Sequence, residues 1–230
     1  MSNPAAEQHY QGDAGRHYHA VKRGIPPEAY LWVAPHRARK LAPHIRETDV
    51  VFEYGVGSGW NLAALKCARR IGCDVSDFLA PTVREHGIEF ITDSSEVKDG
   101  SVDVAICHHT LEHVESPRAV LHELRRVLRP GGTLLLFVPF ESEARYQRHN
   151  PTEPNHHLYS WNVQTLGNLV VVAGFQLRRS EVAVFRFDRF ASRWAARLRL
   201  GECGYRVIRR LANLLDPEHE VRVVAVKPAS

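Results

Sequence analysis

A short run of glycines carries the clearest chemical signal in this sequence. Gly55, Gly57 and Gly59 stand at alternate positions, directly after the apolar run 50–54 and before a stretch of helical pattern. Glycine has no Cβ atom, so a ligand can lie against the backbone there, and the start of the following helix offers unpaired N–H groups. We therefore expect a nucleotide-like ligand at this turn.

The glycine spacing and a nearby acid narrow the choice of ligand. The pattern is G-x-G-x-G, unlike the G-x-G-x-x-G of dinucleotide-binding enzymes, and Glu53 lies two residues before Gly55. A carboxylate would repel a pyrophosphate and suit a cationic ligand. S-adenosylmethionine has an ammonium, a sulfonium and no phosphate, so it meets both conditions. An NAD-dependent dehydrogenase is the least favoured alternative.

Five motifs in chain order resemble those of the class I S-adenosylmethionine-dependent methyltransferases, in particular the small-molecule group with a seven-stranded Rossmann-like sheet. The motifs are residues 51–61, 71–76, 89–94, 102–114 and 123–132, and the resemblance covers residues 48–180. It implies S-adenosylmethionine as the cofactor and S-adenosylhomocysteine as the product.

The resemblance also implies roles for single residues. Asp74 matches the acid that binds both ribose hydroxyls, and a carboxylate can accept two hydrogen bonds at once. Asp93 matches the acid that receives the adenine amino group, and Ser94 would lie beside the ring. The expected cofactor-binding residues are Glu53, Gly55, Gly57, Asp74, Val75, Asp93, Ser94 and His108.

Histidines follow the fourth expected strand, where the methyl group of the cofactor should point. Methyl transfer from a sulfonium is an in-line displacement, so an enzyme must chiefly align the acceptor and remove its proton. Histidine has a suitable pKa for that proton. Of His108, His109 and His113, we expect His109 to be the base, while His113 either assists or packs locally.

The segment 141–160 brings further histidines toward the acceptor. His156 or His157 would serve as a second base or a substrate contact, or as a surface residue without a role. A metal held by His109, His157 and a carboxylate is conceivable, but no fixed ligand spacing supports it, so we predict none. The expected catalytic residues are His109, His113 and His157.

Strands and helices alternate in the part of the chain that must position these residues. We expect strands at 50–54, 71–74, 89–92, 102–107 and 133–139, and helices at 61–70, 78–85 and 117–128. Such alternation predicts a parallel, doubly wound α/β sheet with ligands at the carboxyl ends of its strands. A helix at 161–173 and strands at 175–185 and 221–226 predict a late antiparallel hairpin.

The two ends of the methyltransferase-like region carry additions. We divide the chain into residues 1–47, a helical lid or cap that includes a helix at 28–41, and residues 48–230, the methyltransferase domain. Tyr18, His19, Tyr30 and Trp32 would fold over the cofactor, or the helix would simply pack.

Residues 186–216 form a basic insertion before the last strand. Eight arginines between positions 186 and 210 stand against only Asp188 and Glu202, and Phe187, Phe190, Trp194 and Leu198 have helical spacing. The insertion is therefore expected to be helical and amphipathic. It would contact an anionic or lipid-linked acceptor or a membrane surface. Alternatively it is a covering helix pair with a solvated arginine face, or a dimer surface.

Composition limits the class of protein. The 230 residues carry a net charge of +4, and no apolar run reaches the roughly 20 residues of a membrane span. The polar start lacks a signal-peptide core, and the four cysteines show no C-x-x-C spacing, so we expect a cytoplasmic protein.

The expected activity is O-methylation of a small molecule: a saccharide, a glycolipid or a natural product. A nucleic-acid methyltransferase that uses the arginine segment is one alternative, although the net charge is too weak to favour it. A non-catalytic subunit that binds S-adenosylmethionine is another.

Overall fold

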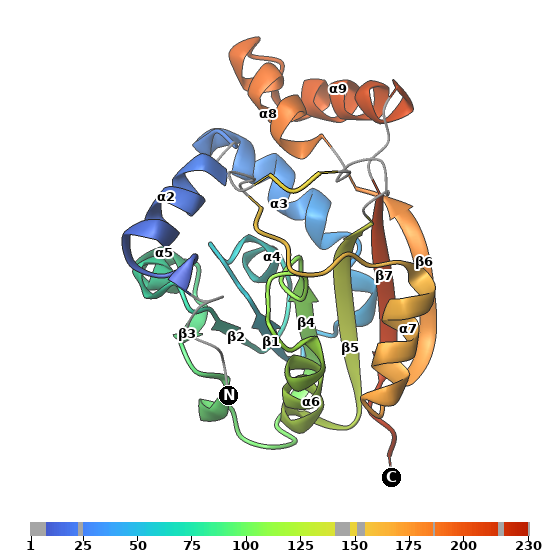
Figure 1. The fold of residues 1–230 in the computed structure, drawn as a ribbon. Helices are drawn as coiled ribbons and strands as arrows, with labels where there is room; N and C mark the ends of the chain where they lie inside the picture. The colour runs from blue at the N-terminus through green and yellow to red at the C-terminus, as the bar shows by residue number, and fades with distance from the viewer. Residues whose placement is uncertain are drawn as a thin grey trace.

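One mixed sheet organises the protein, and the computed structural model describes residues 8–22, 25–140, 148–150, 155–185, 187–215 and 219–229. The strand order is β3-β2-β1-β4-β5-β7-β6 (Figure 1). The strands are β1 (Val50–Tyr54), β2 (Arg69–Cys73), β3 (Glu89–Ile91), β4 (Val102–His108), β5 (Leu128–Phe140), β6 (Gln176–Val184) and β7 (His219–Val226). Only β7 is antiparallel to its neighbours, β5 and β6. The expected doubly wound sheet with a late antiparallel hairpin is confirmed.

Helices cover both faces of this sheet and also extend beyond one end of it (Figure 1). They are α2 (Gly12–Lys22), α3 (Tyr30–Ala38), α4 (Trp60–Ala63), α5 (Ala80–Glu85), α6 (Pro117–Val127), α7 (Val163–Val172), α8 (Asp188–Arg197) and α9 (Gly201–Leu215), with short turns η1 (Pro27–Ala29), η2 (Ala42–His44), η3 (Asp77–Leu79) and η4 (Ser94–Glu96). Side chains cap the starts of α6 and α7: Ser116 accepts from the Ala119 N–H, and Asn162 from that of Thr165. Such caps satisfy N–H groups that a helix start leaves unpaired.

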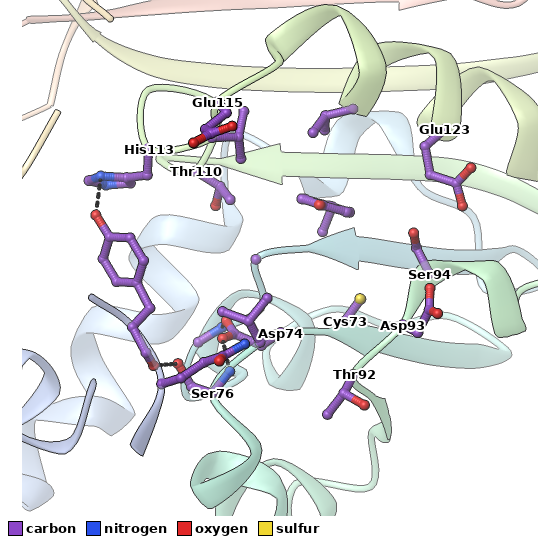
Figure 2. Close-up of a pocket in the computed structure, with 18 of the residues that line it drawn as sticks. Cys73, Asp74, Ser76, Thr92, Asp93, Ser94, Thr110, His113, Glu115 and Glu123 are labelled. Carbon is purple, nitrogen blue, oxygen red and sulfur yellow. Dashed lines mark hydrogen bonds between the residues drawn. The ribbon is translucent and has the colours of Figure 1, made fainter. Parts of the chain in front are cut away.

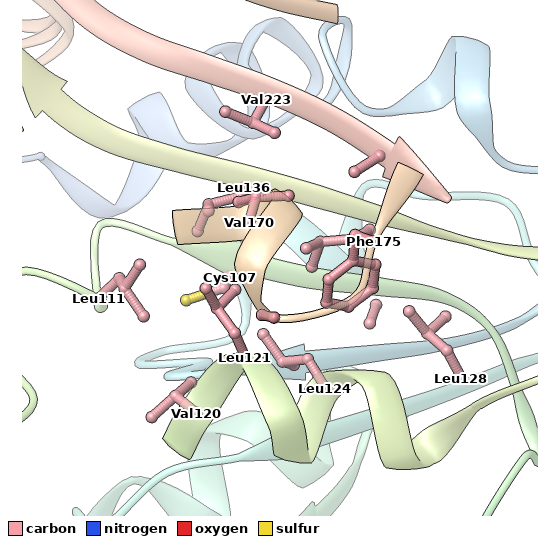
Figure 3. Close-up of a cluster of buried hydrophobic side chains, with 14 of the residues drawn as sticks. Cys107, Leu111, Val120, Leu121, Leu124, Leu128, Leu136, Val170, Phe175 and Val223 are labelled. Atoms are coloured by element: carbon pink, nitrogen blue, oxygen red, sulfur yellow. The ribbon is translucent and has the colours of Figure 1, made fainter. Parts of the chain in front are cut away.

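Two apolar layers hold the helices against the sheet, because successive side chains of a strand point to opposite faces. In β4, Ala105 and Cys107 face the layer of α6 and α7, whereas Val104 and Ile106 face that of α3, α4 and α5. Figure 3 shows the first layer, in which Leu121 of α6 lies in the cluster around Cys107. Burial on both faces explains the nearly continuous apolar runs of these strands.

The helix expected at 61–70 is wrong in length. α4 ends at Ala63, and Arg69 and Arg70 already pair with β1. The side chain of Arg70 explains the early end. It donates to the carbonyl oxygens of Leu62 and Leu65, at 3.0 and 2.6 Å, and so satisfies carbonyls that a longer helix would pair internally.

The remaining elements differ from expectation mainly at their ends. Pro130, Gly131 and Gly132 end α6 as expected but belong to β5, where the pairing with β4 shifts between Val102 and Val104. The Gly131 N–H donates to the carbonyl oxygen of Lys227.

The expected insertion is the helix pair α8 and α9, which Figure 1 shows at one end of the molecule, beyond the sheet. In the described ranges, no helix has the length and apolar character needed to cross a membrane.

Candidate active site

The turn after β1 has the open backbone that its glycines predict. Gly55 and Gly57 adopt φ values of 75° and 53°, a region that favours glycine. A Cβ atom on Gly55 would lie 2.1 Å from Thr110 Oγ1, so the turn packs tightly against the loop after β4. Apart from its two chain neighbours, no atom of the described residues lies within 4 Å of the corresponding position on Gly57, which borders open space. A ligand can therefore approach the backbone at Gly57.

Two adjoining cavities open at the carboxyl ends of the strands. The larger cavity has a volume of about 770 Å³ and the smaller cavity about 620 Å³. Both are bordered by Tyr18, His19, Gly55, Gly57, His109 and His113. The two spaces thus share a border where the glycine turn faces the loop after β4.

The larger cavity collects most of the expected cofactor-binding residues. Asp74, Val75, Asp93 and Ser94 all line it, and Figure 2 shows Asp74 and Asp93 just beyond the ends of neighbouring strands. Thr92, which the motif assignment did not single out, lines it as well. Because β2 and β3 are parallel neighbours, the residues that follow them arrive at the same edge of the sheet.

Backbone amides fix the carboxylate of Asp74. Its Oδ2 accepts from the Gly57 N–H at 2.8 Å, and its Oδ1 accepts from the Ser76 N–H at 2.9 Å. A carboxylate has about four acceptor positions, so two remain for a ligand. Asp74 therefore joins the glycine turn to the end of β2 and keeps acceptor capacity.

Asp93 is an exposed, ionised acid. Its Oδ1 accepts from the Ser95 N–H at 2.9 Å, which caps η4. Hydrogen bonding to Ser95 holds the pKa of Asp93 below its usual range, with Arg126 contributing. The side chain thus presents a negatively charged acceptor to the larger cavity at neutral pH.

Glu53 lies behind the glycine turn and is not among the described residues that line either cavity. Its side chain is buried, and Oε1 accepts from Asn61 Nδ2 at 2.7 Å. Oε2 has no hydrogen-bond partner in the described part of the chain. Burial raises the pKa of Glu53 to about 8, although the hydrogen bond from Asn61 opposes this. Glu53 therefore contacts the start of α4 and supports the turn from below.

His109, the first of the expected bases, is paired with a buried carboxylate. It adopts a φ of 51°, and its backbone N–H donates to the carbonyl oxygen of Phe137. Its Nε2 lies 3.1 Å from Glu220 Oε2, which assigns the proton to Nε2 and leaves Nδ1 as the basic nitrogen. Burial lowers the pKa of His109, while the hydrogen bond to Glu220 opposes this. The ring is therefore neutral at pH 7 and able to take up a proton.

Glu220 is itself held ionised by a largely buried lysine. Lys40 Nζ donates to both carboxylate oxygens at 2.7 Å. Burial acts to raise the pKa of Glu220, but the hydrogen bond from His109 and the charge of Lys40 bring it far below its usual range. Burial also lowers the pKa of Lys40, to about 8. The result is a Lys40–Glu220–His109 chain that ends at the junction of the two cavities.

His113 connects that junction to the N-terminal segment. Tyr10 Oη lies 2.8 Å from His113 Nδ1, and the backbone carbonyl of Tyr10 accepts from Ser76 Oγ at 2.7 Å. His113 Nε2 is 3.8 Å from Glu112 Oε1. The segment around Tyr10 thus lies over the cavities and is tied to both β2 and the loop after β4.

His108 and His157 line the smaller cavity only. The His108 ring stacks on that of His109 with centroids 4.6 Å apart, and burial holds its pKa well below the ordinary value. His157 lies against His113, with ring centroids 4.8 Å apart. The structure therefore separates His108 from Asp74 and Asp93, with which it was grouped, and places it beside the expected catalytic histidines.

Several residues of the site were missed by the sequence analysis. Lys40 and Glu220 contact each other across 180 positions, and nothing in the local pattern of either predicts the pair. The one available signal is an acid at the start of an apolar strand, since Glu220 is fully buried in β7. Glu112 carried a weaker signal, because it lies inside a recognised motif.

Two groups of side chains have the proximity that a metal site needs. Within the described ranges they are His108 with His109 and Glu220, and Glu112 with His113 and His157. In the first group Lys40 already occupies the carboxylate, and a cation would have to displace its ammonium group. The absence of a metal remains a prediction.

The region that carries the glycine turn and the residues of the larger cavity is similar to known methyltransferases. Residues 52–136 match the model of a methyltransferase domain family. The chain is 35% identical to the human thiol S-methyltransferase TMT1B over 100 residues, which cover 38% of the chain and 41% of that protein. It is 30% identical over 166 residues to a probable S-adenosylmethionine-dependent methyltransferase of Mycolicibacterium smegmatis, covering 67% of the chain and 62% of that protein. The chain thus spans less than two thirds of the length of these relatives.

A solved structure extends the likeness to the whole fold. The complex between the Haloferax volcanii Trm112 methyltransferase activator and a putative methyltransferase contains a chain with a TM-score of 0.63 and 20% identity, covering 99% of this chain and all of that one. Strand order and glycine turn together define a Rossmann-like α/β fold. More specifically, residues 52–136 carry a methyltransferase domain, and the relative from Mycolicibacterium smegmatis is named as a probable S-adenosylmethionine-dependent methyltransferase.

Proposed function

We propose that this chain transfers the methyl group of S-adenosylmethionine to an oxygen atom of a small acceptor, namely a saccharide, a glycolipid or a natural product, with His109 as the base. The observation that carries the proposal is the meeting of two cavities at His109 and His113. A transfer reaction needs two substrates in contact, with a proton acceptor at their junction.

The larger cavity would hold the cofactor. The described residues fit it: Gly57 leaves the backbone open, Asp74 offers acceptors for ribose hydroxyls, and Asp93 with Ser94 offers acceptors for an adenine amino group. When bound, S-adenosylmethionine supplies a methyl group already activated by its sulfonium. Glu53 would act indirectly, because it contacts Asn61 and so supports the glycine turn.

His109 would remove the proton of the acceptor. With Nε2 bonded to Glu220, Nδ1 takes the proton, and the neighbouring carboxylate stabilises the imidazolium that forms. Lys40 keeps Glu220 ionised for this purpose. We assign His113 and His157 to orienting the acceptor, since both line the smaller cavity.

The lining of the smaller cavity favours an amphiphilic acceptor. Aromatic rings of Tyr30, Phe140, Phe185 and Phe190 border it beside the polar groups of Asn155 and the histidines. Such a lining suits a sugar ring, which stacks on aromatic faces and presents hydroxyl groups at its edge.

A second candidate function is methylation of RNA. The chain is 32% identical over 120 residues to a tRNA (carboxymethyluridine(34)-5-O)-methyltransferase of Macaca fascicularis, covering 46% of the chain and 18% of that protein. Arginines of the α8–α9 pair could contact phosphates. RNA binding that falls steeply with salt would support this alternative, and absent or salt-insensitive binding would exclude it.

Calorimetric titration with S-adenosylmethionine, S-adenosylhomocysteine and NAD tests the cofactor site. We expect binding of the first two and none of NAD. Asp74→Asn should weaken S-adenosylmethionine binding on the order of tenfold to a hundredfold, because an amide nitrogen cannot accept from a ribose hydroxyl. Asp77→Asn, which changes an exposed acid three residues later, should bind as the unaltered chain does. Equal affinities for the two variants would overturn the role of Asp74.

Transfer itself is tested with cofactor labelled in its methyl group. Purified protein would be incubated with lipid extract, polar metabolite extract and RNA in parallel. Label in the first or second fraction supports the proposal, and label confined to RNA supports the second candidate. Tight cofactor binding without any labelled product would identify a non-catalytic binding subunit.

A further inference from the structure

The α8–α9 hairpin presents large apolar side chains to the outside of the molecule. Their exposed fractions run from 43% to 87%. They are Phe190, Trp194, Leu198, Leu200, Val207, Leu211, Leu214 and Leu215. Figure 1 shows both helices at one end of the protein, where they extend beyond the sheet. A cluster of this size is uncommon on a surface that faces only water.

The exposed side chains follow the helical repeat. Phe190 and Trp194 of α8 and its C-cap residue Leu198 stand four residues apart, and Val207 and Leu211 have the same spacing along α9. Residues at this spacing share one face of a helix. Each helix therefore has an apolar stripe, and in both cases that stripe points away from the protein.

The opposite faces of the two helices are already packed. Ala191, Ala195 and Tyr205 form a small buried cluster with Val33 of α3. Because the inward faces are occupied, the apolar stripes cannot be explained as the faces that cover the domain. The helix pair thus covers α3 with one face, while its outer side carries exposed apolar residues as well as the expected arginines.

A buried carboxylate fixes the hairpin in this orientation. Asp188 accepts from Arg37 Nε of α3 at 2.8 Å, from Arg209 Nε at 2.7 Å and from Tyr205 Oη at 2.8 Å. One side chain therefore joins α3, α8 and α9. The outward direction of the stripes follows from these contacts.

The charge around the stripes is strongly positive. Exposed arginines accompany them, and within 187–215 the acids are Asp188, which is buried, and Glu202, which pairs with Arg206. The exposed arginines are Arg189, Arg193, Arg197, Arg199, Arg206 and Arg210. A partner must therefore be apolar where it meets the stripes and anionic around them.

We propose that the α8–α9 hairpin docks the protein on a lipid bilayer that contains anionic headgroups. The apolar stripes would enter the boundary between headgroups and acyl chains, and the arginines would contact the headgroups. A second copy of the chain would bring like charges together. Nucleic acid would satisfy the arginines and stack on Trp194, but it offers no partner to the leucines.

Docking at this place would bring the acceptor site to the membrane. Phe187, Arg189 and Phe190, at the start of the hairpin, also line the smaller cavity. On the basis of the function proposed above, the acceptor would be an amphiphile whose polar part reaches His109 while its apolar part stays in the bilayer.

Vesicle flotation tests the docking surface. The full chain would be mixed with vesicles of phosphatidylcholine, or of phosphatidylcholine with phosphatidylglycerol, at low and high salt. We expect binding to the anionic vesicles that weakens with salt. Leu214→Ser with Leu215→Ser should reduce this binding about tenfold or more, because two apolar side chains are lost from the stripe. Val171→Ser with Val172→Ser is the matched control, since it alters an adjacent pair of exposed apolar residues on α7.

The outcomes separate docking from catalysis. Each variant would first be titrated with S-adenosylmethionine, so that a folding defect is detected. Retained cofactor binding with lost flotation supports the docking surface. Failure of the unaltered chain to float with anionic vesicles, or equal losses in the α9 and α7 variants, overturns it. A dimer of the unaltered chain in sedimentation velocity without lipid, which the Leu214→Ser and Leu215→Ser variant loses, would show that a second copy covers the stripes and would also overturn it. A chain that floats but does not bind S-adenosylmethionine would refute the proposed function alone.

Discussion

Three carboxylates of the site differ in charge because their surroundings differ. Burial of Glu53 favours its neutral form, although the hydrogen bond from Asn61 opposes this. Asp93 is exposed and receives a backbone N–H, which favours its ionised form. Glu220 is buried too, yet Lys40 and His109 keep it ionised. Burial therefore does not decide the charge of an acid by itself, and its partners must be counted as well.

The contact between Glu220 and His109 predicts how the pKa of the His109 ring responds to a substitution. Burial lowers the pKa of His109, and the carboxylate acts in the opposite direction. In Glu220→Gln the favourable charge is lost, so the pKa of His109 should fall further and the ring should titrate at lower pH. NMR titration of the imidazole resonances measures both values without any acceptor, and His109→Gln identifies the resonance.

The matched control for that titration is Glu85→Gln, which removes an exposed carboxylate from α5. It should leave the titration of His109 unchanged. A ring that titrates at or above the ordinary value of 6.5, or a ring that ignores Glu220→Gln, would contradict the role given to the pair.

Single residues of the site could be predicted from the sequence where they lie inside contiguous motifs. Asp74 and Asp93 each follow a strand at a characteristic position, and both do line the larger cavity. Lys40 and Glu220 could not be found in this way, because their contact joins residues 180 positions apart and depends on the complete fold. The sequence also did not predict that His108 lines the smaller cavity, because the position of a residue at the end of a strand does not fix the direction of its side chain.

At the scale of elements, one carboxylate joins the hairpin to the domain. Asp188→Asn should loosen α8 and α9, because Arg37 and Arg209 would be left close together without the charge that they share. Loss of one partner from a buried ion pair costs about 3–5 kcal/mol. Hydrogen exchange followed by mass spectrometry should show faster exchange in α8 and α9 and little change in β1 to β5.

Glu202→Gln provides the comparison within the same hairpin. Its pair with Arg206 is exposed, so the loss should be less than about 1 kcal/mol. If α8 and α9 exchange their amide hydrogens equally slowly in the Asp188 and Glu202 variants, the hairpin is held by its apolar contacts with α3 instead.

Elements were predictable where the apolar pattern alone decides them. The strands from β1 to β5 and the helix α6 follow from runs and repeats in the sequence. The length of α4 did not, because the side chain of Arg70 ends it from eight residues away. The direction of α8 and α9 did not either, since an amphipathic repeat defines two faces without saying which of them meets the protein.

For the whole molecule, Glu53 predicts how stability changes with pH. Its pKa is about 8 in the folded chain against 4.5 as the ordinary value, so the folded state binds one more proton between these limits. Folding is then favoured below pH 4.5, and stability declines as the pH rises to 8, by a few kcal/mol in order of magnitude. In Glu53→Gln this decline should disappear from the free energy of unfolding in urea, compared between pH 5 and pH 8.

The control is Glu89→Gln, which alters an acid at the start of β3 that pairs with Arg69 on the surface. It should keep the decline. A Glu53→Gln variant with the same pH dependence as the unaltered chain would show that other groups dominate.

The Lys40–Glu220–His109 chain also orders events during synthesis. Its members come from the N-terminal segment, the loop after β4 and the last strand. A nascent polypeptide that has left the ribosome as far as β6 already contains the glycine turn, Asp74, Asp93 and His109, but not Glu220. On the proposed function, it can begin to assemble the cofactor site while His109, the proposed base, still lacks the carboxylate that orients it. Competence for methyl transfer would then arrive only with translation of β7, after every residue proposed to contact the cofactor has been made.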